Sequence, residues 1–244
     1  MGDLEGLKAA LLAAMRIDGG SPGGALSAVA AVGAEALPGD GAAVTLMSTD
    51  AQRQTLAATN DVVAAIEVAQ YSLGEGPSLD ALTTARPVLV PDLTHGRPQA
   101  AWPVLANQLA GLPVAALFAF PMRLGATSVG VALSYRATAG RLDRDEVAFA
   151  LRATQILTLT LLEIREQHAG PNDEGDLLGD GRLGDWQVHQ ATGMLMVQLG
   201  GVTSLNAFAR LRAYTFAHEH SLEQVAADIV AGRLILEPDD GTPT

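Results

Sequence analysis

Cysteine is absent from the 244-residue sequence, and aromatic residues make up only 4% of it. Without cysteine the chain has no disulfides, no thiolate metal ligands and no thiol nucleophile. Hydrophobic residues nevertheless reach 48%, so we expect a sizeable core filled mainly by Ala, Val and Leu. This length suits one ordinary domain plus a smaller one.

A long uninterrupted hydrophobic run is also missing. The most apolar stretch, residues 112–122, contains Pro113 and Pro121, and it is well short of the roughly 20 residues that a membrane span needs. The N-terminus begins with acidic residues, whereas a secretory signal begins with basic ones. We therefore expect a soluble, cytoplasmic protein.

Basic residues are scarce. The net charge is −12, from 27 acidic and 15 basic residues. Residues 169–181 hold four acidic residues and no basic one, and residues 182–236 hold four of each sign. No segment of the sequence has the excess of Lys and Arg that is typical of a strong, non-specific nucleic-acid binder.

Turn residues and apolar periodicity divide the chain into five parts. Residues 1–19 contain a surface helix, 20–168 mix helices with strands, 169–181 form an acidic linker rich in Gly and Pro, 182–236 contain three helices, and 237–244 are an acidic tail. The sequence therefore predicts two domains joined by a linker.

Within the larger part, strands are expected between helices. Periodicity predicts helices at 4–15, 25–37, 62–69, 78–82 and 143–167, and strands at 42–47, 54–58, 88–90, 114–122 and 129–135. Ser78 is expected to cap its helix, and Asp143, Asp145 and Glu146 match the negative charge that a helix N-terminus favours. Antiparallel strands flanked by helices indicate an α+β fold.

Four motifs follow one another in this part of the chain. They are Gly74-Glu-Gly-Pro-Ser-Leu-Asp-Ala-Leu82, Arg86-Pro-Val-Leu-Val-Pro-Asp-Leu93, Trp102-Pro103 and Phe118-Ala-Phe-Pro-Met-Arg123. In this order they resemble the GAF domain, a sensory module of bacterial signalling proteins, over residues 20–168. The resemblance implies a pocket between sheet and helices and adds a small-molecule ligand to the expected partners.

The candidates to line that pocket are Leu73, Leu79, Trp102, Phe118 and Phe120. The same side chains could instead fill the core, because scarce aromatics are natural packing anchors. Family members often have cysteine where this chain has Ser78, and GAF-like methionine sulfoxide reductases use cysteines, so neither thiol chemistry is open to this chain.

Other signatures of chemistry are weak. Gly74-Glu-Gly76 has only two glycines of a dinucleotide fingerprint. His218 and His220 lack the spacing of a zinc-protease helix and would point to different helix faces. We expect no catalytic residue, cofactor or metal.

The C-terminal half of the 143–167 helix is apolar almost all round, from Ile156 to Leu162. Such a pattern indicates a second buried face in addition to the one on the sheet. We expect a homodimer contact there, with Ile156, Leu157, Leu161 and Ile164 as candidates.

The last three predicted helices span about 183–199, 204 onwards and 221 onwards, the third beginning with the capping box Ser221-Leu-Glu-Gln224. They contain Gln190-Ala-Thr-Gly-Met-Leu-Met196, Asn206-Ala-Phe208, Leu211-Arg212 and Leu222-Glu-Gln-Val-Ala226. In this order the segments resemble the ANTAR domain, a three-helix module of bacterial transcription antitermination regulators that bind RNA.

The resemblance implies RNA contacts on the first two of these helices. The candidates are Gln190, Ala191, Thr192, Gly193, Arg210, Arg212 and Tyr214. A glycine in the middle of a helix is about 1 kcal/mol less favourable than alanine. Close approach of a partner to the helix would explain why glycine occupies position 193. The family usually has lysine where this chain has Thr192, and asparagine and arginine near Glu219, His220 and Ser221.

These resemblances imply a non-enzymatic, signal-responsive regulator whose partners are RNA stem-loops and which controls transcription antitermination. A second interpretation is a regulator whose C-terminal helices dock a partner protein, with RNA binding weakened or lost; the balanced charge of residues 182–236 favours it. A third is a small-molecule-binding or enzymatic protein of the GAF fold.

Overall fold

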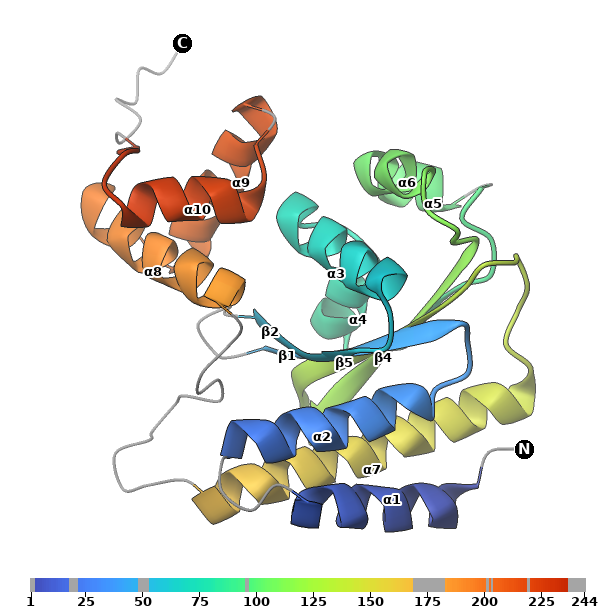
Figure 1. Ribbon diagram of the computed structural model, residues 1–244. Coiled ribbons are helices and arrows are strands. Elements are labelled where there is room, and N and C mark those ends of the chain that lie inside the picture. Colours follow the sequence, from blue (N-terminus) through green and yellow to red (C-terminus); the bar gives the residue numbers. More distant parts are fainter. Residues whose placement is uncertain are drawn as a thin grey trace. The chain divides into compact units, whose positions relative to one another are not determined.

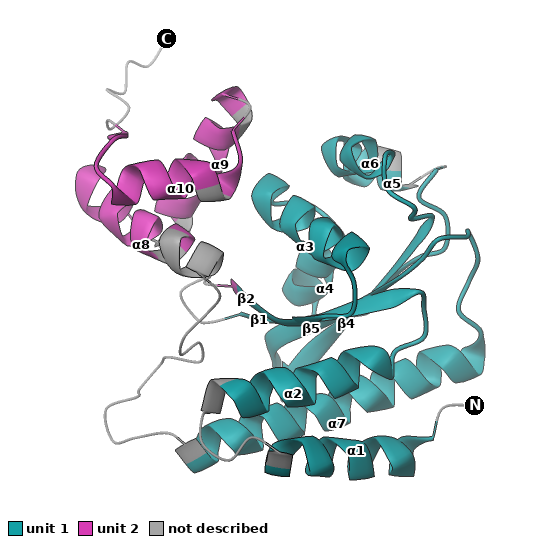
Figure 2. Ribbon diagram, viewed as in Figure 1, with its two compact units in different colours: residues 1–47, 54–179 teal, residues 48–53, 180–244 magenta. Residues whose placement is uncertain are grey.

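The chain forms two compact units, which are described separately (Figure 2). The N-terminal unit comprises residues 1–47 and 54–179, and the C-terminal unit comprises residues 48–53 and 180–244. The computed structural model describes residues 3–17, 22–47, 53–94, 97–168, 183–200, 202, 204–218 and 220–236. The predicted linker at 169–181 and the predicted tail at 237–244 lie outside the described residues.

A five-stranded sheet organises the N-terminal unit. Its strands are β1 (Gly41–Met47), β2 (Arg53–Ala58), β3 (Val88–Val90), β4 (Ala116–Leu124) and β5 (Thr127–Arg136). Their order across the sheet is β2-β1-β5-β4-β3, and the pairs β1–β5, β4–β5 and β3–β4 are antiparallel. The predicted α+β fold is confirmed, with each predicted strand within two residues of its observed start and end.

Helices cover both faces of this sheet (Figure 1). On one side of the sheet, α2 (Pro22–Glu35) and α7 (Arg144–His168) contact the strands, and α1 (Leu4–Ile17) packs on these two helices. On the other side, α3 (Asp61–Leu73) and α4 (Pro77–Thr84) contact the strands, with α6 (Pro103–Leu109) packed on α3 and α5 (Arg97–Ala101) on α6. The sequence predicted neither α5 nor α6. Both are short, and a pattern of apolar residues is weakest over five to seven positions.

Alternation along the strands separates two cores. On β4, Phe118 and Phe120 face the α2/α7 side, whereas Leu117 and Ala119 face the α3 side. Successive strand residues point to opposite faces, so one apolar run supplies both cores. As expected from the composition, Ala, Val and Leu make up most of both clusters.

Helix α7 packs closely on α2. A Cβ atom added to Gly33 of α2 would lie 2.6 Å from Cδ2 of Leu157, so only glycine allows this approach. By length and composition α7 could also span a membrane. Within this unit the helix lies in the core, with Ala150, Ala153, Leu157, Leu161 and Ile164 all buried.

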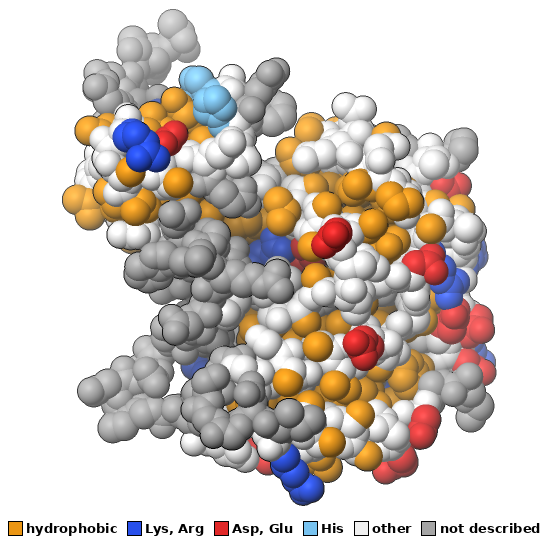
Figure 3. All heavy atoms as spheres, in the orientation of Figure 1, with side chains coloured by type: hydrophobic (Ala, Val, Ile, Leu, Met, Phe, Trp, Pro, Cys, Tyr) orange, Lys and Arg blue, Asp and Glu red, His pale blue; other side chains and the backbone are white. Residues whose placement is uncertain are grey.

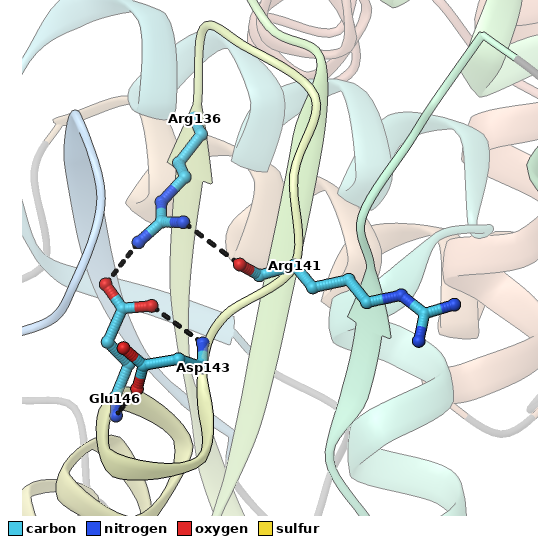
Figure 4. Close-up of polar contacts among 4 residues, drawn as sticks. All are labelled: Arg136, Arg141, Asp143 and Glu146. Carbon is cyan, nitrogen blue, oxygen red and sulfur yellow. Dashed lines mark hydrogen bonds and ion pairs between the residues drawn. The ribbon is translucent and has the colours of Figure 1, made fainter.

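The N-terminus of α7 is closed by a reciprocal capping pair (Figure 4). The Glu146 backbone N–H donates to Oδ1 of Asp143 at 2.8 Å, and the Asp143 N–H donates to Oε2 of Glu146 at 2.9 Å. Arg136, at the end of β5, donates to Oε1 of Glu146 and to the Arg141 carbonyl. These carboxylates therefore have structural partners, as the helix-terminus prediction implied.

The described part of the C-terminal unit contains α8 (Leu183–Gln198), α9 (Ser204–His218) and α10 (Leu222–Val230). Each helix contacts the other two. The predicted capping box is confirmed: Ser221 Oγ accepts from the Gln224 N–H, and Oε1 of Gln224 accepts from the Ser221 N–H, both at 3.1 Å. Buried positions recur at helical spacing, namely Val188, Ala191, Leu195, Ala207, Phe208, Leu211, Leu222, Val225, Ala226 and Ile229.

Candidate functional site

The loop Gly74–Pro77 connects α3 to α4 and also contacts α6. Gly74 ends α3 in the left-handed region (φ 69°), and its N–H donates to the Gln70 carbonyl at 2.9 Å. The Glu75 carboxylate accepts from the backbone N–H of Leu105 at 2.8 Å. It thereby caps α6, whose own N-cap residue, Trp102, makes no side-chain cap.

Below this loop lies a buried polar cluster formed by Thr45 of β1, Glu67 and Gln70 of α3, and Ser78 of α4. All four residues are at least 95% buried. Oε1 of Glu67 accepts from the Ser78 hydroxyl at 2.9 Å and from the Gln70 amide at 3.1 Å, and Oε2 accepts from the Thr45 hydroxyl at 2.7 Å. The Gln70 amide also donates to Ser78 Oγ at 3.0 Å and accepts from the Ser78 N–H at 2.8 Å.

The cluster uses its own donors internally. Both hydrogens of the Gln70 amide and the hydroxyl hydrogens of Ser78 and Thr45 are directed at cluster members. Buried polar groups satisfied in this way rigidify a core. The cluster therefore cross-links α3, α4 and the sheet, and a ligand could use these groups only after displacing one of them.

Ser78 does not cap α4 as predicted. The helix begins at Pro77, Gly76 is its N-cap residue with no side-chain cap, and Ser78 lies inside the first turn. Its hydroxyl is turned into the buried cluster instead, where burial makes an unpaired hydroxyl unfavourable.

The five pocket candidates do not share one site. Trp102 is buried in the core on the α3 side, and Leu73 packs partly buried against the same cluster. Phe118 and Phe120 lie in the other core, beneath α2 and α7, because their strand parity directs them there. Leu79 is half-buried on α4. The idea of a single pocket lined by all five residues is therefore wrong.

Sequence reasoning missed Glu67 and Gln70, although a signal was present. Val63, Ile66, Glu67 and Gln70 form one helical stripe, spaced by three, one and three residues, and all four are buried. Two polar residues within an apolar stripe indicate a buried polar network, because such groups need partners.

The RNA candidates on α8 separate by exposure. Gln190 and Gly193 are exposed, whereas Ala191 is fully buried among the three helices. Ala191 is therefore a core residue of the three-helix unit. Thr192 is half-buried, and its hydroxyl donates to the Val188 carbonyl at 2.7 Å. A Cβ atom on Gly193 would meet no atom within 4 Å, so packing within the described residues does not require glycine there.

The candidates on α9 lie on two sides of the helix. The Arg212 guanidinium stands 5.1 Å from the centroid of the Phe208 ring, a cation–π arrangement next to the helical core. Arg210 and Tyr214 are half-buried and line a separate surface groove. His218, which is not among the predicted RNA contacts, stacks on Tyr214 and lines the same groove.

Charged side chains are sparse on the face shown in Figure 3, where hydrophobic and uncharged atoms dominate.

Among the described residues, no group of three or more His, Cys, Asp or Glu side chains could hold a metal ion.

The dimer candidates on α7 are mostly inside the N-terminal unit. Leu157, Leu161 and Ile164 are buried in its core, and Ile156 packs partly buried against it. The predicted contact through these four residues therefore does not fit, because their stripe is covered by α2 and the sheet. The exposed apolar residues of α7 are instead Leu151 and Leu159, at 43% and 51% exposure.

Solved structures resemble this chain in fold. The phycocyanobilin-bound GAF domain of a cyanobacterial phytochrome has a TM-score of 0.50 and 14% identity, covering 69% of this chain and 98% of its own. The GAF domain of an Acinetobacter phosphoenolpyruvate-protein phosphotransferase has a TM-score of 0.49 and 12% identity, covering 69% and 97%. The free methionine-R-sulfoxide reductase of Neisseria meningitidis has a TM-score of 0.45 and 14% identity, covering 67% and 89%.

At these identities the similarity shows only the fold. The fold assignment rests on the phytochrome GAF domain, which has a TM-score of 0.50. The five-stranded sheet with helices on both faces is the GAF fold. No protein-family model and no curated protein matches this sequence.

Proposed function

We propose that this chain is a non-enzymatic, cytoplasmic sensor and effector. Its GAF-fold domain receives a signal, and its three C-terminal helices, an ANTAR-like domain, bind structured RNA to control transcription antitermination. The proposal that the C-terminal helices bind RNA rests on which motif residues are buried and which are exposed. Phe208, Leu211 and Ala226 are buried, as a helical core requires. Gln190 and Gly193 remain exposed, with open space over the glycine.

Unpaired loops of structured RNA fit this surface better than a regular double helix. Residues 182–236 contain four arginines and no lysine, against four acids, which is too little positive charge to hold a phosphate backbone by charge alone. Proteins recognise RNA loops through splayed bases and stacking as well as backbone contacts. A few arginines beside exposed polar and aromatic groups match that mode.

The test is a titration of the full-length protein with a pool of double-hairpin RNAs at low and at moderate salt. We expect binding at low salt, weakened at least several-fold when Arg212 is replaced by alanine. Arg86→Ala removes the same charge from an exposed turn of the GAF-fold domain and serves as the control. No binding at low salt, with the oligomeric state verified, would exclude the RNA half.

For the sensory half, we propose a small-molecule signal on the α3 side of the sheet. The support is the loop Gly74–Pro77, where Glu75 holds α6 and Ser78 enters the polar cluster. A ligand entering there would have to release one of these contacts, which couples binding to helix positions. The test for a bound small molecule is native mass spectrometry of the purified protein, which detects a co-purified molecule by its added mass.

We also propose a homodimer, through the outer surface of α1 and α7 rather than the buried stripe first predicted. These helices contact each other. Between them they expose Leu12 at 51%, Leu151 at 43% and Leu159 at 51%. Burying these side chains against a second copy of the chain would remove apolar surface from water, which favours association.

One observation favours the second candidate function, a regulator whose C-terminal helices dock a protein. Val197 and Ile235 are 80% and 66% exposed on the C-terminal unit. The low-salt RNA titration separates the two functions, because a protein-docking surface of balanced charge would not retain RNA.

A further inference from the structure

Helix α9 has a second face that does not belong to the helical core. Phe208, Leu211 and Thr215 are buried on the core side. Arg210, Ala213, Tyr214, Ala217 and His218 recur at spacings of three, one, three and one and line a groove of about 380 Å³. Ile235 and Leu236, which follow α10, complete its lining. A cavity of this volume is within the range of small-molecule sites.

Three flat groups lie in one row along this groove. Arg210, Tyr214 and His218 are separated by four residues each, which places successive groups about 6 Å apart along the helix. The Tyr214 and His218 rings are stacked, with centroids 3.9 Å apart and an interplanar angle of 18°. His218 is exposed, so the ring pair presents an open aromatic surface to the groove.

The His218 ring is also oriented. Its Nδ1 lies 2.9 Å from the Tyr214 carbonyl oxygen. A carbonyl oxygen can only accept, so Nδ1 carries the hydrogen and, in the neutral ring, Nε2 is left as an acceptor. The opposite edge of the ring therefore offers a hydrogen-bond acceptor beside a stacking surface.

We propose that this groove receives one unpaired RNA base, which stacks on the Tyr214–His218 pair. His218 Nε2 accepts from the 2′-hydroxyl of a ribose beside the stacked base, and the Arg210 guanidinium holds an adjacent phosphate. Unpaired bases are recognised on aromatic and guanidinium planes in this way, and the 2′-hydroxyl is a donor found only in RNA. This inference rests on the proposed RNA-binding function and deepens it by naming the ligand element and its site.

The first test compares two probes with the full-length protein by fluorescence anisotropy. One probe is a pool of hairpin RNAs with randomised loops, and the other is a continuous blunt RNA duplex of equal length. We expect tighter binding of the hairpin pool. Tyr214→Ala should lower the affinity for it roughly 5- to 150-fold, the effect of removing one stacked aromatic. Tyr214→Phe keeps the ring and should stay within about twofold of the wild type.

Unfolding of Tyr214→Ala would also weaken RNA binding. A second pair of variants therefore tests the groove without removing the aromatic ring. Ala217 and Ala209 are both exposed on α9, but only Ala217 lines the groove. Ala217→Glu places a carboxylate where the base would lie and should lower the hairpin affinity about tenfold or more. Ala209→Glu adds the same charge to the same helix outside the groove and should change it about twofold or less.

The outcomes separate this inference from the proposed function. If the wild type binds the hairpin pool and both Tyr214→Ala and Ala217→Glu bind it equally well, the groove is not the base site and the RNA-binding function stands. If Ala209→Glu weakens binding as much as Ala217→Glu, the effect is one of charge alone and the groove assignment fails. If the wild type binds neither RNA at low salt, the proposed function fails and the base site with it.

Discussion

Gly76 occupies a backbone conformation that only glycine adopts readily, with φ at 135°. A Cβ atom there would lie 2.5 Å from Oε1 of Gln70 and 2.8 Å from Cδ2 of Leu105. The residue therefore lets the Gln70 amide and α6 approach the loop.

We predict that Gly76→Ala lowers the free energy of unfolding by about 1–3 kcal/mol, from backbone strain and displacement of the Gln70 amide. Gly111→Ala is the control, because a Cβ there meets nothing within 4 Å. Urea unfolding followed by circular dichroism measures both. Equal stability of the two variants would show that the loop can relax around the added methyl group.

Gly193 gives the opposite expectation. Its place inside α8 is exposed and open, so Gly193→Ala should raise the free energy of unfolding by up to about 1 kcal/mol. If RNA approaches α8 there, the same variant should bind hairpin RNA more weakly. Unfolding and RNA titration of one preparation give both results. A variant that is more stable and binds RNA as well as the wild type would remove Gly193 from the interface.

At the scale of elements, the capping of α6 from Glu75 joins residues far apart in sequence. The donor, Leu105, lies 30 positions from the acceptor. Glu75→Ala should therefore weaken α6 specifically, by about 0.5–2 kcal/mol. Hydrogen exchange at the backbone amides of α6 should accelerate, while exchange in α7 stays unchanged. Glu166→Ala, an exposed acid on α7, is the control, and uniform acceleration in both helices would contradict a local role.

Helix α7 provides a second test, because we expect one of its faces to stabilise the fold and the other to form the dimer contact. Leu161 is buried and Leu159 is half-exposed. Leu161→Ala should destabilise the fold by about 2–5 kcal/mol. Leu159→Glu should change stability by only about 0.5 kcal/mol but shift the protein from dimer to monomer in sedimentation velocity. A Leu159→Glu protein that remains dimeric would exclude this face as the contact.

Helix prediction was most accurate where the apolar stripe was long, and it missed the short helices α5 and α6. The 25-residue α7 was predicted to within a residue at each end, whereas α5 and α6, of five and seven residues, were missed. A short helix depends on contacts made by other segments, such as the Glu75 cap, and these leave no local pattern in the sequence.

At the scale of the whole molecule, charge limits how RNA can be held. The chain carries a net charge of −12, and residues 182–236 contain four arginines. If each of these neutralises one phosphate, the slope of log affinity against log salt is about −3.6 per protomer at most. Titrations at several salt concentrations measure it. A clearly steeper slope would mean that cations of the N-terminal unit also contact RNA.

The sequence by itself determined the α+β composition, the positions of most elements, the capping box at Ser221 and the stripes that become buried. These follow from local periodicity and local hydrogen bonding, which act over a few residues. Only the tertiary structure decided which face of the sheet Phe118 and Phe120 occupy, where the Ser78 hydroxyl points and which stripe of α7 stays exposed. Alternation along a strand specifies that there are two faces, but the elements that cover each face are brought there by contacts between distant segments.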